Sequence, residues 1–223
     1  MYSFLFLPLV LSWIVGWRFK NRIAYYGNIS LSSGLTGQQV AEKMLRDSGI
    51  YDVTISTSDG QLSDHYDPDT RQVNLSSDIY YGTSIASAAV AAHECGHAVQ
   101  HARAYAFLNW RTGLVPAMNL ANTWAPWLII GGFFALSVFP FLLLAGIALL
   151  AVTVLFSLVT LPIEFDASRR ALAWLNNQPR VMYEEEQKQA KNALWWAAMT
   201  YVVAALAAMG TLMYYLSFLN RRN

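Results

Sequence analysis

Long segments without a charged residue most constrain how this chain can fold. No Asp, Glu, Lys or Arg occurs before Arg18, from Thr112 to Ile163, or from Ala193 to Asn220. An apolar run of about 18 residues or more is long enough to cross a bilayer as a helix. The chain is 55% hydrophobic and only 13% charged, far from the balance of soluble proteins. The sequence therefore predicts an integral membrane protein.

The charge-free segments predict about four transmembrane helices. Residues 1–17 are just long enough for one span, and basic residues follow it, which is typical of an uncleaved anchor rather than a signal peptide. Residues 112–163 are too long for one span and right for two of about 20 residues, with a turn near 137–140. Residues 193–219 form the fourth predicted span.

The polar segments predict a small α+β domain at residues 18–111 and a helical segment at 164–192. After a loop that ends in a helix cap, we expect an amphipathic helix whose apolar side carries Val40, Ala41, Met44 and Leu45. A strand at 51–57 and a hairpin of 61–66 with 71–75 should follow. The second hairpin strand either offers a free edge to an extended peptide or is an edge strand that simply closes a small sheet.

A short motif, His93-Glu94-Cys95-Gly96-His97, lies in a helix predicted from about residue 83 to residue 103. His93 and His97 are one helical turn apart, so both imidazoles can reach a single zinc ion. Glu94 is placed to take a proton from a zinc-bound water rather than to bind the metal. Cys95, the only cysteine, should point away from the metal. The motif predicts zinc peptidase chemistry; the alternative is a buried helix that carries two histidines by chance.

A catalytic zinc usually has three protein ligands, so a third must be found. His101 lies two turns, roughly 12 Å, along the axis from His93, which is too far for one shared ion. No histidine follows His101, so we expect a carboxylate: Glu164, Asp166, or the cluster Glu184-Glu185-Glu186. The three consecutive glutamates are more typical of a solvated helix start.

Four side chains are candidates for stabilising the oxyanion of a peptide hydrolysis: His65, Tyr66, Tyr80 and Tyr81. Each carries a donor that could lie near developing negative charge. Tyrosine is also common in strands and at membrane interfaces, so a structural role is the alternative for each.

Several segments together resemble a known family. They are His65-Tyr66-Asp67-Pro68, Ala91–Gln100 around the motif, and Leu161–Phe165. In these segments the chain resembles the YugP-like bacterial membrane-bound neutral zinc metallopeptidases, and it is distantly similar to the HtpX and CAAX prenyl protease gluzincins. The resemblance runs over most of the chain, including the number and order of spans. It implies one Zn²⁺ per chain, held by His93, His97 and Glu164, with Glu94 as general base.

One position departs from the HtpX-type pattern. An Asp usually stands four residues after the third ligand and supports a ligand histidine, whereas this chain has Ser168 there. A serine orients a histidine only weakly, so we expect support from Asp166 or from elsewhere.

The expected fold is a mainly α membrane protein with about four transmembrane helices and a small α+β zincin-like cytoplasmic domain that carries the H-E-x-x-H helix. Arginines flank residues 112–163 on both sides, which favours a multi-pass membrane protein with its active site on the cytoplasmic side. The family resemblance implies that this membrane is the plasma membrane of a bacterium. The expected activity is that of a zinc metalloendopeptidase, acting on membrane proteins or on misfolded or cytoplasmic-face proteins.

Two other classes of function are weighed against the peptidase. A catalytically silent zinc-containing scaffold or adaptor would explain Ser168 but would not need Glu94. A transporter fits poorly, because no predicted span contains an ionisable residue. The net charge of +1 and the absence of a basic run give no indication of a nucleic-acid partner. The expected partners are therefore a protein or peptide substrate and the lipid bilayer.

Overall fold

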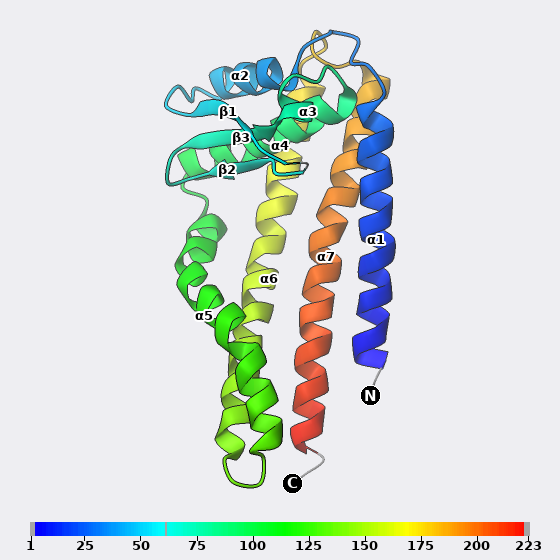
Figure 1. The fold of residues 1–223 in the computed structure, drawn as a ribbon. Coiled ribbons are helices and arrows are strands. Elements are labelled where there is room, and N and C mark those ends of the chain that lie inside the picture. The colour runs from blue at the N-terminus through cyan, green and yellow to red at the C-terminus, as the bar shows by residue number, and fades with distance from the viewer. Residues whose placement is uncertain (1–2, 61, 221–223) are drawn as a thin grey trace. The chain divides into compact units, whose positions relative to one another are not determined.

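The computed structural model describes residues 3–60 and 62–220, which form a mainly helical chain with one small sheet (Figure 1). The helices are α1 (Ser3–Gly27), α2 (Gly37–Asp47), α3 (Ser77–Tyr80), α4 (Ile85–Ala102), α5 (Ala106–Phe134), α6 (Pro140–Asn176) and α7 (Glu184–Asn220). The strands are β1 (Thr54–Ser58), β2 (His65–Asp67) and β3 (Gln72–Ser76).

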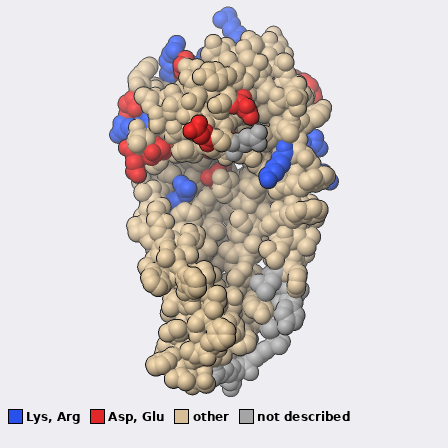
Figure 2. All heavy atoms as spheres, in the orientation of Figure 1, with Lys and Arg blue, Asp and Glu red and all other residues tan. Residues whose placement is uncertain are grey.

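The chain divides into two compact units. The sheet unit comprises Gly16–Tyr105 and Ile163–Met199, and the helical unit comprises Met1–Val15, Ala106–Pro162 and Thr200–Asn223. Most of the charged side chains visible in Figure 2 lie over the sheet unit. This distribution follows from the sequence, because the charge-free segments supply nearly all of the helical unit.

Two of the described helices, α6 and α7, are long and apolar enough to cross a membrane. The predicted turn near 137–140 is confirmed, since α5 ends at Phe134 and α6 begins at Pro140. The other two predicted spans, at 1–17 and in the first half of 112–163, stay predictions, and residues 1–2 lie outside the described part of the chain. The helix that contains the predicted anchor continues to Gly27 instead of ending near residue 17.

Helix α2 forms as its sequence predicts. Thr36 caps its first turn in a reciprocal capping box with Gln39, which satisfies backbone donors that the helix leaves free. The predicted apolar side is confirmed: Val40, Ala41, Met44 and Leu45 are all buried. This side belongs to the core of the sheet unit, together with the small residues of α4.

The sheet has the strand order β1-β3-β2, with β1 parallel and β2 antiparallel to β3. The predicted hairpin of β2 and β3 is confirmed, although Gln61, at its predicted start, lies outside the described residues. The expectation that the second hairpin strand is an edge strand is wrong, because β1 pairs with its other side. Val73 and Leu75 of β3 are fully buried, which suits a central strand. The sheet edges are therefore β1 and β2.

Helix α4 contains the H-E-x-x-H motif and contacts α6 at very short range. Ser84 caps its start by accepting a hydrogen bond from the Ser87 amide. A methyl group at Gly96 would lie 2.5 Å from the carbonyl oxygen of Ala167, so the two helix backbones touch there. Glu164, Ala167 and Ser168 recur at helical spacing and form one buried face of α6. The contact at Gly96 brings that face against the motif.

We predict that Gly96→Ala destabilises the protein by about 1–3 kcal/mol, because backbone atoms cannot move aside as a flexible side chain can. Thermal unfolding of the detergent-purified protein measures this. Gly16→Ala is the matched control, since Gly16 is also helical but nothing lies within 4 Å of the added methyl group. The control should be neutral or slightly stabilising. Equal melting temperatures for the two variants would contradict the contact between α4 and α6.

Candidate metal centre

Three potential ligand atoms converge between α4 and α6. The Oε2 atom of Glu164 lies 3.3 Å from His93 Nε2 and 3.7 Å from His97 Nε2. All three ligand atoms lie within 4.8 Å of one another. The Glu164 side chain is only 6% exposed, and the two histidine side chains are 12% and 14% exposed. The cluster is thus largely shielded from solvent.

The chemistry of this cluster fits a zinc ion. Glu164 Oε2 is buried and has no hydrogen-bond partner among the described residues, and a buried carboxylate oxygen is costly without a partner or a cation. Ligand atoms around a tetrahedral zinc ion, at bond lengths of about 2.0–2.1 Å, lie roughly 3.3 Å apart. The distances from Glu164 Oε2 to the two Nε2 atoms, 3.3 and 3.7 Å, are close to this value.

The Glu164 carboxylate strongly affects the pKa of His97. Burial alone would lower the pKa of His97, but the negative charge of the Glu164 carboxylate beside it outweighs burial and raises the pKa to about 9. The carboxylate that favours a proton at this position also favours a divalent cation. Metal binding must displace that proton, as for other histidine sites.

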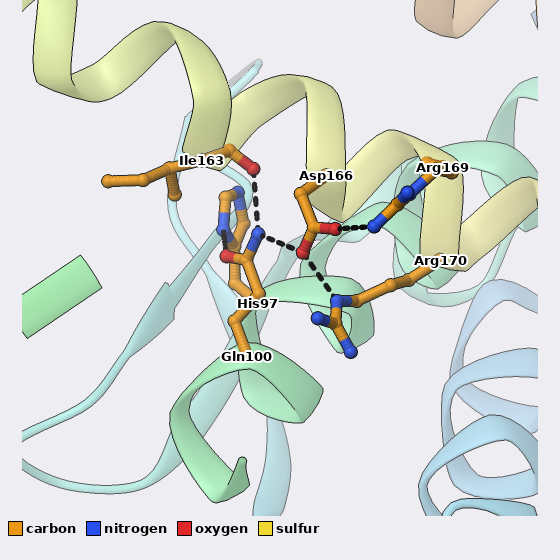
Figure 3. Close-up of polar contacts among 6 residues, drawn as sticks. All are labelled: His97, Gln100, Ile163, Asp166, Arg169 and Arg170. Atoms are coloured by element: carbon orange, nitrogen blue, oxygen red, sulfur yellow. Dashed lines mark hydrogen bonds and ion pairs between the residues drawn. The ribbon is translucent and has the colours of Figure 1, made fainter. Parts of the chain in front are cut away.

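Gln100 determines which nitrogen of His97 faces the cluster (Figure 3). Its amide group donates hydrogen bonds to the Ile163 carbonyl at 2.8 Å and to Asp166 at 3.0 Å. Because both partners are acceptors, the amide oxygen of Gln100 must face His97 Nδ1, 3.1 Å away. His97 Nδ1 is then the donor of that bond. The other ring nitrogen, Nε2, faces Glu164 and is a potential metal ligand.

Asp166 anchors this arrangement from α6. Its carboxylate accepts hydrogen bonds from Arg169 and Arg170 as well as from Gln100 (Figure 3). Asp166 thus acts on His97 through Gln100, which matches the expected supporting role rather than that of a ligand. The role of Gln100 was not predicted. Its position three residues after His97, on the same side of one helix, is the signal that was available.

Ser168 supports the other histidine directly. Its hydroxyl lies 3.1 Å from His93 Nδ1, so the serine at the position of the HtpX-type aspartate still contacts the His93 ring. A neutral hydroxyl holds the ring by a weaker bond than a carboxylate would. The two histidines are therefore supported by different means.

Glu94 lies beside the cluster in a buried position. It is 7% exposed, and burial raises the pKa of its carboxyl group, although the charges of His93 and His97 act in the opposite direction. A raised pKa brings a carboxylate closer to the range in which it can both accept and return a proton near neutrality.

Of the candidates for oxyanion stabilisation, His65 and Tyr66 lie on β2, and Tyr80 and Tyr81 lie at the end of α3. Tyr66 forms a hydrogen bond of 2.7 Å with His101 Nδ1, which ties β2 to the end of α4. His65 is exposed, and its Nδ1 lies 2.7 Å from the Ser63 carbonyl oxygen. Tyr80 and Tyr81 stack edge to face on each other. The structure brings none of the four into the three-residue cluster.

The remaining candidates have other partners. Within the acidic cluster, Glu186 accepts hydrogen bonds from Ser32, while Glu184 and Glu185 pair with Lys188. The metal cluster found among the described residues contains none of these glutamates. Cys95 is buried and points to the Ala41 carbonyl, away from the cluster as expected.

We predict that Gln100→Leu weakens zinc binding by about 10- to 100-fold, because His97 loses the acceptor that orients it. Competition with a chelator of known affinity measures the change. Gln38→Leu, which alters a glutamine of α2 that donates a hydrogen bond to Glu42, should bind zinc like the parent protein. Wild-type affinity in Gln100→Leu would show that this amide does not orient the ligand.

Comparison with known proteins agrees with this geometry. A family model described as "Putative neutral zinc metallopeptidase" matches residues 1–220. The chain is 39% identical over 224 residues to a Bacillus subtilis (strain 168) protein named "Putative membrane protease YugP", covering 99% of this chain and 98% of that protein. No solved structure gives a significant match. The chain belongs to the family of neutral zinc metallopeptidases that contains this membrane protein.

Proposed function

We propose that this chain is a membrane-embedded zinc metalloendopeptidase with His93, His97 and Glu164 as zinc ligands and Glu94 as general base. The observation that carries the proposal is the convergence of two Nε2 atoms and an unpartnered buried carboxylate oxygen. Membership in a zinc metallopeptidase family supports the choice of metal and of reaction class.

The residues divide the work of peptide hydrolysis among them. Zinc, when bound, supplies Lewis-acid chemistry that acidifies water and polarises a peptide carbonyl. The Glu94 carboxylate accepts the proton of the attacking water and then delivers it to the leaving amine. Gln100 and Ser168 hold the rings of His97 and His93 in place. Glu164 is assigned to the metal and Asp166 supports Gln100. Glu94 is therefore the acid left to move a proton.

The cavity proposed to receive the substrate lies along the first turn of α4, and its lining residues do not include His93, His97 or Glu164. A cavity of about 890 Å³ is lined by Ala86 and Ser87 of α4, by Asp64, and by Lys20 and Asn21 of α1. Ala86 precedes His93 by seven residues, about two turns, and so lies within roughly 20° of it around the helix. The α1 residues follow directly on the charge-free segment at 1–17. This placement supports cleavage of substrate segments near the membrane surface.

Strand β2 is the sheet edge that would pair with an extended substrate. It is an outer strand of the sheet, and the contact of Tyr66 with His101 holds it beside α4. Edge strands present unpaired backbone groups that an added peptide can satisfy. The peptide-pairing role first considered for β3 is therefore assigned to β2.

The proposed topology has four spans, at 1–17, twice within 112–163, and at 193–219. The polar segments 18–111 and 164–192 then lie together on the cytoplasmic side of the plasma membrane of a bacterium. The apolar character of α6 and α7 supports two of these spans. The arginines on both flanks of 112–163 support the orientation.

The rival proposal, a silent zinc-containing scaffold, loses its main support in this geometry. It rested on Ser168 in place of an aspartate, yet Ser168 contacts His93 and Gln100 supports His97. A scaffold also has no use for a buried acid at Glu94, which is costly to bury.

We predict that Glu94→Gln keeps about one zinc per chain and lowers hydrolysis of an unstructured reporter protein by about 100-fold or more. The amide cannot accept the proton but preserves the shape of the side chain. Glu42→Gln, at an exposed glutamate of α2, serves as the matched control and should cleave normally. Equal turnover in Glu94→Gln and in the control would remove Glu94 from the mechanism.

We predict that Glu164→Ala lowers the zinc content of the purified protein, because one of three ligands is lost. Elemental analysis after dialysis against a weak chelator measures the content. The control is Glu185→Ala, which changes an exposed glutamate of the acidic cluster and should retain zinc. Full occupancy in Glu164→Ala would move the third ligand to another carboxylate.

A further inference from the structure

A groove of about 600 Å³ lies between the polar ends of α6 and α7, entirely within the sheet unit. It is distinct from the metal cluster, since none of His93, His97 and Glu164 lines it. Its wall combines basic side chains with apolar ones: Arg169, Lys188 and Lys191, and Phe165, Leu172 and Trp195.

The groove carries a surplus of positive charge. Glu184 is the only carboxylate among its lining residues, against three cationic side chains. Lys188 is paired with Glu184 and Glu185 on the exposed side, and Arg169 is shared with Asp166. Within residues 3–60 and 62–220, Lys191 has no ion-pair partner. An anion in the groove would therefore meet the uncompensated charge of Lys191, with Lys188 one helical turn away.

The apolar wall lies where two apolar helices become polar. Phe165 follows the charge-free segment 112–163 by two residues, and Trp195 is the third residue of the charge-free segment 193–220. Both side chains are exposed, at 38% and 54%. Tryptophan at the end of a spanning helix is typical of the membrane interface.

We propose that this groove binds one anionic phospholipid, with its phosphate between Lys188 and Lys191 and an acyl chain against Phe165 and Trp195. Only a ligand with an anionic head and an apolar tail satisfies both walls, and basic pockets between spanning helices bind such headgroups. The inference rests on the proposed entry of α6 and α7 into the bilayer. Because Ser168 lines the groove and also contacts His93, the lipid lies next to a support of the metal cluster.

The test counts lipids bound to the full-length protein in nonionic detergent by native mass spectrometry. Dioleoyl phosphatidylglycerol is compared with dioleoyl phosphatidylcholine, which has the same chains and no net charge. We expect at least tenfold tighter binding of the anionic lipid. Lys188→Gln/Lys191→Gln should weaken its binding by roughly 10- to 30-fold and leave phosphatidylcholine binding unchanged. Trp195→Ser should weaken the binding of both lipids.

The matched control is Lys43→Gln/Arg46→Gln, which removes two cations from α2. One of them, Lys43, is paired with a carboxylate, as Lys188 is. It should bind both lipids like the parent protein. Equal binding of the two lipids, or an equal loss in the control, would overturn the proposal. Displacement of the lipid by glycerol phosphate would instead assign a simple phosphate site, and displacement by an acidic peptide would assign a peptide surface.

A separate measurement keeps this inference apart from the proposed topology. Membranes are washed with alkaline carbonate, which releases peripheral proteins but leaves spanning proteins in the pellet. Retention without a preference for phosphatidylglycerol would reject the lipid site alone. Release into the supernatant would reject both the spans and the lipid site.

Discussion

The contact of two helix backbones at Gly96 and Ala167 is the constraint on which the candidate site depends. Only a residue without a side chain permits α4 to approach α6 so closely. At this distance Glu164, three residues before Ala167, reaches the histidines on either side of Gly96. The same glycine that lies between the two histidines in sequence therefore lets Glu164 reach them from α6.

Around this contact, buried polar groups satisfy one another in a directed chain. The two arginines hold Asp166, Asp166 and the Ile163 carbonyl orient Gln100, and Gln100 orients His97. Each link has a donor facing an acceptor, as buried polar groups require. This series of hydrogen bonds ends at Glu164, whose Oε2 atom has no hydrogen-bond donor among the described residues. A cation is the partner that completes it.

The distribution of charge along the sequence places this chemistry next to the apolar segments. Glu164 is the first charged residue after the long charge-free segment that ends at Ile163, and Lys191 is the last before the segment that begins at Ala193. Glu164 and the basic groove thus occupy the polar margins of apolar helices. Such a position is suited to substrates and lipids that present themselves at a membrane surface.

The sequence by itself determined the local features: the apolar helices, the cap and buried side of α2, the β2–β3 hairpin, and the pairing of His93 with His97 on one helix. These depend on spacing within a few residues, which a periodic pattern reports directly. Residue spacing also limited the third ligand to a few carboxylates, and the family resemblance singled out Glu164 among them.

Only the tertiary structure decided the rest. It placed β3 in the centre of the sheet, because the parallel partner β1 is joined to it through a long connection that leaves no short-range signal. It selected Glu164 over Asp166 for the metal cluster, and it gave Gln100 its role. Residues 63 to 75 positions apart in sequence meet there, and such contacts depend on how α4 packs against α6 rather than on any local pattern.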